Sequence, residues 1–106
     1  MLWENQDPDS GFSEQTISCD TSKYKAFLLV MRSENTSEYY YESIIANIRS
    51  FPMDVYGCAD SHWYKRIAKA TENGIWFEEN GYRAYRGSSF VSSQNYAIPL
   101  KVYGIR

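Results

Sequence analysis

The chain is poor in the residues that build helical cores. Its 106 residues include only four leucines and three methionines, against eighteen aromatic side chains: ten Tyr, five Phe and three Trp. Leu, Ala, Glu and Lys favour helices, whereas aromatic and β-branched residues favour strands. The composition therefore disfavours an all-α domain. The length fits one domain and leaves no room for a cofactor domain beside a substrate domain.

Long apolar runs are also absent. The longest, Ala26 to Met31, is far shorter than the roughly 20 residues that a membrane-spanning helix needs. The opening residues lack the basic start and apolar stretch of a signal peptide. We therefore expect a soluble chain without membrane insertion.

Cysteine and histidine are too scarce for a disulfide framework or a zinc site. Cys19 and Cys58 could form one disulfide, but they lack C-x-x-C spacing, and we favour two free thiols, which suit assembly in a reducing cytoplasm. One histidine with two distant cysteines offers too few zinc ligands. The acidic cluster from Asp7 to Gly11 lacks the later carboxylates of a calcium loop. We expect neither a metal nor a cofactor.

The net charge of −2 conceals an asymmetry between the two halves of the chain. Residues 1–60 hold ten acidic and four basic side chains, and residues 61–106 hold three acidic and seven basic ones, which gives −6 and +4. One interpretation is a basic face that meets nucleic acid or an acidic glycan. It would be built from Lys65, Arg66, Lys69, Arg83 and Arg86. The isoelectric point near 5.3 favours solvated charges instead, so we expect no nucleic-acid partner.

Turn formers divide the chain into short segments. The cluster from Asp7 to Gly11 predicts an irregular lead-in over residues 1–11, followed by a single domain over 12–106. Phe12 to Cys19 is compatible with a strand. Tyr24 to Arg32 is apolar on both alternating faces from Ala26 onward, which is typical of a central strand covered on two sides.

Two further segments fit helix and strand alike. Residues 38–49 match the helical i, i+3, i+4, i+7 spacing but also carry strand propensity, and residues 62–72 show the same conflict. Composition favours strands. Asn73-Gly74 and Asn80-Gly81 suit type I′ turns, so we predict a three-strand antiparallel meander. Its strands are Tyr64–Glu72, Ile75–Glu79 and Tyr82–Arg86.

The chain closes with a predicted strand from Tyr96 to Arg106. Pro99 cannot donate to a ladder, so it should lie on an edge, at a bulge or with its nitrogen facing outward. The alternation places Ile98, Leu100, Val102 and Gly104 on one face and Pro99, Lys101, Tyr103 and Ile105 on the other. Six to eight short strands in all predict an antiparallel β-sandwich of the jelly-roll kind.

No catalytic constellation stands out. His62 follows Asp60 and Ser61, but neighbouring residues of a strand point to opposite faces, so Ser61 and His62 would not address each other as a triad requires. Glu78 and Glu79 make a poor glycosidase pair for the same reason. There is no phosphate-binding loop. We expect the protein not to be an enzyme.

Aromatic side chains are the remaining candidates for function. Most should fill the core, because so few aliphatic residues cannot fill it alone, and a minority should serve an interface or stack on sugars. The candidate contacts lie in the loop from Ser33 to Tyr41 and in the aromatic and basic second half. They are Tyr39, Tyr41, Trp63, Trp76, Tyr82, Arg83, Tyr85 and Arg86.

The two ends of the chain carry a resemblance. The residues are Leu2-Trp3-Glu4-Asn5 with Pro8 and Phe12, Gln15 to Ser18 with Lys23-Tyr24, Gly74 to Phe77, Gly81-Tyr82, and the closing stretch Asn95 to Ile105. They resemble C-terminal domains in tail or minor structural proteins of phages and prophages of gut-type bacteria. The closing I-P-x-K-x-Y-G-I pattern is the most specific piece, and residues 33–61 diverge. A chain that is short and begins at Met1 fits a stand-alone protein or an excised domain.

The resemblance implies a virion component of β-sandwich type, assembled in the host cytoplasm and placed at the distal end of a fibre or spike. Trimers, contacts with other virion proteins and host-surface recognition are usual there, and no catalytic residues come with it. A carbohydrate-binding module with an aromatic stacking platform is the alternative hypothesis. The two coincide if the target is a bacterial surface glycan.

Overall fold

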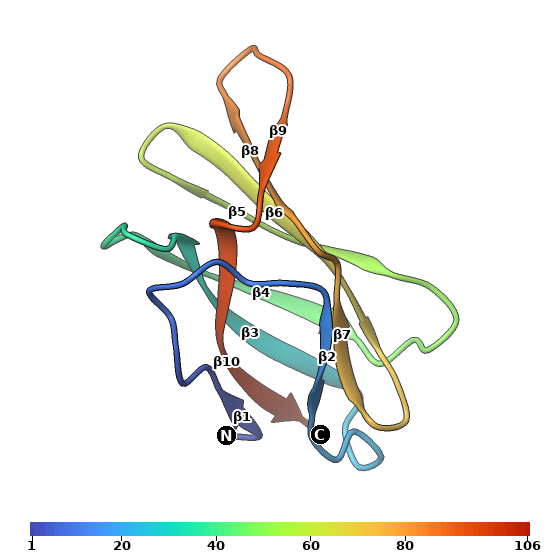
Figure 1. Cartoon of the computed structure of the whole chain (residues 1–106). Coiled ribbons are helices and arrows are strands. Elements are labelled where there is room, and N and C mark those ends of the chain that lie inside the picture. The colour runs from blue at the N-terminus through green and yellow to red at the C-terminus, as the bar shows by residue number, and fades with distance from the viewer.

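The computed structural model describes residues 1–106, and its regular elements are all β-strands (Figure 1). They form two antiparallel sheets packed as a β-sandwich, which confirms the predicted class with ten strands instead of six to eight. The smaller sheet has the order β1 (Trp3–Glu4), β10 (Tyr96–Ile105), β3 (Ala26–Glu34), β4 (Tyr40–Ala46). The larger sheet has the order β2 (Gln15–Ser18), β7 (Gly74–Phe77), β6 (His62–Ala70), β8 (Gly81–Tyr85), β9 (Val91–Ser93), and β5 (Met53–Ala59) also pairs with β6.

The core lies between the sheets and takes every second residue of the long strands. In β3, Phe27, Leu29 and Met31 are fully buried, and the residues between them are only partly buried. Ile45 of β4 lies beside Phe27, and Val102 of β10 lies beside Leu29. Both ambiguous segments are strands, β4 and β6, as composition favoured.

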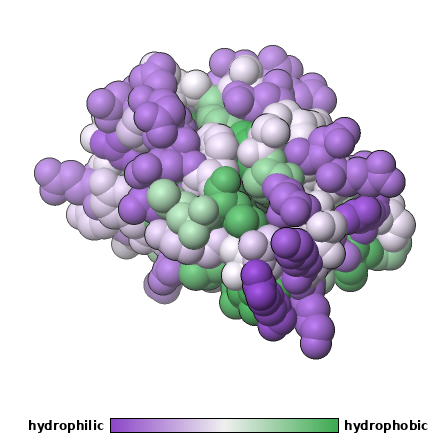
Figure 2. Space-filling model, turned by 90° about the horizontal axis from the view of Figure 1, so that it is seen from below, coloured by the Kyte–Doolittle hydropathy of each residue, from purple (hydrophilic) through white to green (hydrophobic).

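β3 is central, as predicted, but the prediction that both of its faces are covered is wrong. One face meets the larger sheet, whereas no other layer of the chain lies over the second. Apolar residues on that face therefore stay partly open to solvent. Seen from below, the molecule shows hydrophobic residues at its surface between hydrophilic ones (Figure 2).

The meander prediction is correct in its three strands and wrong in their order. β7 and β8 both pair with β6, β7 along Ala68–Ala70 and β8 along His62–Lys65. The chain therefore does not turn back at Asn80-Gly81, but continues past a break along the same edge of β6. The two-residue turn with positive φ at both positions lies at Asp60 (51°) and Ser61 (63°), between β5 and β6.

The closing strand β10 carries a bulge that changes its side-chain alternation. The register with β3 shifts between Pro99 and Lys101, which confirms a bulge at the proline. Pro99 is consequently buried, so its predicted facing is wrong, whereas Leu100 packs against the core as predicted and also lines an outer hollow. Beyond the bulge the alternation is as predicted, with Val102 in the core.

The lead-in is less irregular than predicted. β1 pairs with β10 through Trp3 and Val102, and the Trp3 ring packs edge-on against Phe12 with ring centroids 6.2 Å apart. Phe12 in turn packs edge-on against Phe77 at 5.4 Å. A chain of aromatic contacts thus ties the first residues to the larger sheet.

A buried cation completes the core. Arg66, on the inner face of β6, is fully buried, so it does not contribute to any basic face. Its guanidinium donates hydrogen bonds of 2.7–3.2 Å to six backbone carbonyl oxygens. The acceptors belong to Phe12, Glu78, Glu79, Gln94, Tyr96 and Ala97. Burial lowers the pKa of Arg66 to about 10, which leaves it protonated at neutral pH.

Replacing Arg66 should therefore be severe. Arg66→Met leaves several buried carbonyls without a donor, at about 1–3 kcal/mol each, so we expect a loss of at least about 3 kcal/mol in the free energy of unfolding. The melting temperature should fall by more than about 10 °C. Lys69→Met is the matched control, because Lys69 is a partly exposed cation on the same strand. Equal melting temperatures in calorimetry would contradict the role given to Arg66.

Candidate functional site

One end of the larger sheet projects beyond the sandwich. The β8–β9 loop stands at the top of Figure 1 with the β5–β6 turn beside it, and both chain termini lie at the opposite end. The middle strand of the sheet, β6, begins at this end with His62, Trp63 and Tyr64. We call this end the tip.

The outer face of the tip carries an aromatic patch, defined as Tyr56, Trp63, Tyr82 and Phe90 around Lys65. The Tyr56 and Trp63 rings stack with centroids 5.4 Å apart, and they are 41% and 39% exposed. The ammonium of Lys65 lies 4.7 Å from the Phe90 ring centroid and 5.6 Å from that of Tyr82. Cation–π attraction of this kind holds the lysine over the rings.

Strand register explains why these side chains meet. Lys65 pairs with Tyr56 of β5 on one side and with Tyr82 of β8 on the other, and directly paired residues project from the same face. Burial, together with the Glu78 carboxylate that accepts its hydrogen bond, raises the pKa of Tyr82. The Tyr82 hydroxyl therefore stays a donor and fixes its ring at the rim of the patch.

Beside the patch is a tip hollow of about 400 Å³, within the size range of small-ligand sites. It is lined by Cys58, Ser61, His62, Trp63, Tyr85 and Arg86. His62 and Tyr85 pair across the strands, and their rings meet edge to face at 5.0 Å. The hollow thus places ring faces next to hydroxyl, imidazole and guanidinium groups.

The imidazole is held by the backbone. His62 Nδ1 lies 2.7 Å from the carbonyl oxygen of Asp60, so Nδ1 is the donor of that pair. The ring has no hydrogen bond to Ser61. The sequence Asp60-Ser61-His62 therefore forms a turn and does not form a nucleophile–base pair.

A polar network supports the tip from the inner side. The carboxylate oxygen Oε2 of Glu34 accepts hydrogen bonds from the Tyr64 hydroxyl at 2.7 Å and from Arg83 Nη1 at 3.1 Å. The Arg83 guanidinium also lies 4.5 Å from the Tyr96 ring centroid. Burial and the bond to Glu34 raise the pKa of Tyr64, which keeps it protonated as a donor. The network ties β3 of the smaller sheet to β6 and β8.

The structure separates the eight predicted contact residues. Trp63, Tyr85 and Arg86 line the tip hollow, and Tyr82 belongs to the adjoining patch. Arg83 lies beneath them in its ion pair with Glu34.

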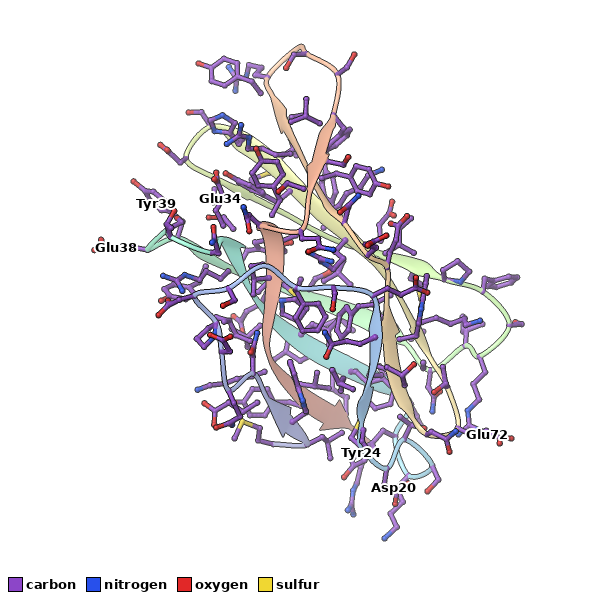
Figure 3. The ribbon with its side chains drawn as sticks, in the orientation of Figure 1. Asp20, Tyr24, Glu34, Glu38, Tyr39 and Glu72 are labelled. Atoms are coloured by element: carbon purple, nitrogen blue, oxygen red, sulfur yellow. The ribbon has the colours of Figure 1, made fainter.

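The other three predicted residues lie elsewhere. Tyr39 is exposed in the β3–β4 loop, next to Glu38 at one side of the sandwich (Figure 3). Trp76 lies further along the larger sheet, and its indole N–H donates to Glu14 at 3.0 Å. Tyr41 is buried over Gly57, with its hydroxyl donating to the Val55 carbonyl at 3.3 Å, so it is not part of the exposed surface.

Sequence reasoning missed Tyr56, Phe90, His62, Ser61 and Cys58 as members of this site. The available signal was β5, in which Val55 is buried while Tyr56 and Cys58 are exposed, an alternation typical of a half-buried strand. The predicted basic face does not form as one set, because Arg66 is buried and Arg83 is paired.

The cysteines and the carboxylates form no further site. Cys19 and Cys58 are both free thiols, and burial together with the charge of Asp20 raises the pKa of Cys19. No three His, Cys, Asp or Glu side chains are grouped so as to hold a metal ion. The fold has no helix that is long and apolar enough to cross a membrane.

Comparisons with known proteins leave the fold and the site as the basis for any assignment. No family model matches the chain, and neither the curated proteins nor the solved structures gave a match.

The β5–β6 turn should accept a better turn sequence. Asp60 and Ser61 both adopt positive φ, for which Asn-Gly is the preferred pair. We expect the double variant Asp60→Asn/Ser61→Gly to raise the free energy of unfolding by about 0.5–1 kcal/mol. Ser89→Gly, in the β8–β9 loop without positive φ, should bring no gain. Chemical denaturation measures both, and a destabilised double variant would contradict the turn geometry.

Proposed function

We propose that this chain is a non-enzymatic recognition module of a phage or prophage structural protein, which self-associates and binds a host-surface or virion partner through the tip. The observation that carries the proposal is the pairing of the aromatic patch with the tip hollow at the projecting end of the sandwich. In such a virion component the tip is the part that meets the partner.

The composition of the tip supports binding. Single exposed rings are normal on a protein surface, but their concentration in one patch marks an interaction site. Trp, Tyr and Arg are the residues enriched at the energetic centres of interfaces, and Trp63, Tyr85 and Arg86 stand together at the hollow. The rings are mounted on paired strands, so little conformational entropy is lost when they are covered.

The resemblance supports the setting. The closing stretch, which carries its most specific motif, forms the long strand β10 between β1 and β3. Gly104 lies under the Tyr24 ring, where a Cβ atom would clash with it. The residues at the two ends of the chain that carry the resemblance therefore belong to the framework of the sandwich. Three residues of the tip, Tyr56, Cys58 and Ser61, come from the divergent middle of the chain. This division suits a common framework with a variable recognition end.

A carbohydrate-binding module is the second candidate, and the tip hollow favours it. A sugar ring stacks on aromatic faces while its hydroxyls bond to polar groups at the edge. Trp63 and Tyr85 supply the faces, and Ser61, His62 and Arg86 supply the polar groups. The two candidates become one if the partner is a bacterial surface glycan.

The decisive test is a panel of bacterial cell-wall glycans followed by calorimetric titration of any binder. We expect Trp63→Ala to weaken binding at least tenfold, because it removes the ring shared by the patch and the hollow. Trp76→Phe is the matched control, since Trp76 is a partly buried tryptophan of the same sheet outside the tip. Melting temperatures establish that both variants fold.

Two results would count against the tip. Binding that survives Trp63→Ala but fails in Trp76→Phe would move the site along the sheet. If no glycan binds, the carbohydrate candidate fails, and a protein partner from the same virion or host surface is what the tip must then bind.

A further inference from the structure

The outer face of the smaller sheet is apolar and uncovered. We call it the apolar face and define it as Ala26, Leu28, Val30, Ile44, Ala46, Tyr103 and Ile105. Ile44 is 60% exposed, and the others are partly buried. The face lies on the side of the sandwich away from the larger sheet, and β4, β3 and β10 supply all of it.

Strand register arranges this face in rows across β10, β3 and β4. Two rows are apolar, Ile105–Ala26–Ala46 and Tyr103–Leu28–Ile44. The third is Glu4–Lys101–Val30–Glu42, with a cation on one side of β3, an anion on the other, and a second carboxylate beyond the cation on β1. Neither Lys101 nor Glu42 forms an ion pair within the chain.

This order of charges is complementary to itself under one symmetry operation. A twofold axis parallel to β3 exchanges the two sides of the sheet, so it places Lys101 of one copy opposite Glu42 of the other, twice. Val30 and Leu28 then meet their own counterparts, and Tyr103 meets Ile44. A twofold axis crossing the strands at this row would oppose like charges instead.

Shape agrees with charge at the end of the face. Tyr40 of β4 is 58% exposed beside Arg32. The same region holds a hollow of about 390 Å³, which extends from Leu100 and Lys101 of β10 across β3 to Tyr40 itself. The axis along β3 brings the Tyr40 ring of each copy over the β10 side of the other, where Leu100 and Lys101 line the opposite wall of that copy's hollow.

We propose that the apolar face binds a second copy of this chain in a twofold dimer, with the two smaller sheets packed face to face. Aligned sheets pack about 10 Å apart, which brings side chains of both faces into contact. The dimer is isologous, because each copy contributes the same face. The proposal rests on the self-association in the proposed function and gives it a surface and a symmetry, where the resemblance implies a trimer.

The test is the mass of the protein in solution across a range of concentrations. We expect a species of twice the 12.4 kDa chain mass by sedimentation. Lys101→Glu and Glu42→Lys should each weaken the dimer at least tenfold, and the double swap Lys101→Glu/Glu42→Lys should restore it. Lys69→Glu, on the outer face of the larger sheet, is the matched control and should leave the dimer intact.

Ile44→Asp provides an independent variant, because Ile44 is exposed in the single chain and its loss should not disturb folding. It should also give monomers. Single charge variants that stay dimeric, or a double swap that does not recover, would overturn the proposed face.

The remaining outcomes separate this inference from the proposed function. A trimer would overturn the twofold face and leave self-association standing. A monomer at all concentrations would overturn both the twofold dimer and the self-association in the proposed function. The apolar face would then be a surface for a different protein. Glycan binding at the tip is measured separately and survives either failure.

Discussion

The guanidinium of Arg66 lies where three segments of backbone meet. It donates hydrogen bonds to backbone carbonyls of residue 12, of residues 78–79 and of residues 94–97. The last two segments are the two feet of the β8–β9 hairpin, so one side chain anchors both legs of the projecting tip. A planar group with five N–H donors suits this task, since charge-assisted bonds to every side offset the cost of burying the cation. Desolvation lowers its pKa, yet the six carbonyl oxygens favour the protonated form.

The elements that could be predicted from the sequence are those whose pattern is local. Alternation in Ala26 to Arg32 and in residues 62–72 marked β3 and β6, and composition decided the ambiguous segments for strand. Asn73-Gly74 correctly marks the turn between β6 and β7, whereas Asn80-Gly81 does not form a hairpin turn, because turn preference is weaker than tertiary pairing. β7 and β8 pair with the same edge of β6. The two neighbouring residues that adopt positive φ are Asp60 and Ser61, in the turn between β5 and β6.

Long-range features escaped the sequence for a physical reason. Nothing near Arg66 along the chain predicts that it is buried. Its acceptors are backbone carbonyls of residues that are separated from it by 12 to 54 positions in the sequence. The sequence pattern shows that the second face of β3 is apolar. Whether another layer covers that face depends on where the remaining strands of the chain pack, which the local pattern does not determine. The candidate residues Trp63, Tyr85 and Arg86 were found by type. That these residues lie close to Tyr56 and His62 follows from the register of the paired strands, which the sequence pattern alone does not predict.

The pairing of β1 with β10 brings the first and last strands of the sandwich together at the pole opposite the tip (Figure 1). Joining the present ends by a short linker and opening the chain in a surface loop elsewhere would keep the strand order of both sheets, so the fold is a natural subject for circular permutation. The same geometry means that any polypeptide attached at either end leaves from one pole. In any such fusion the tip would point away from the attached segment.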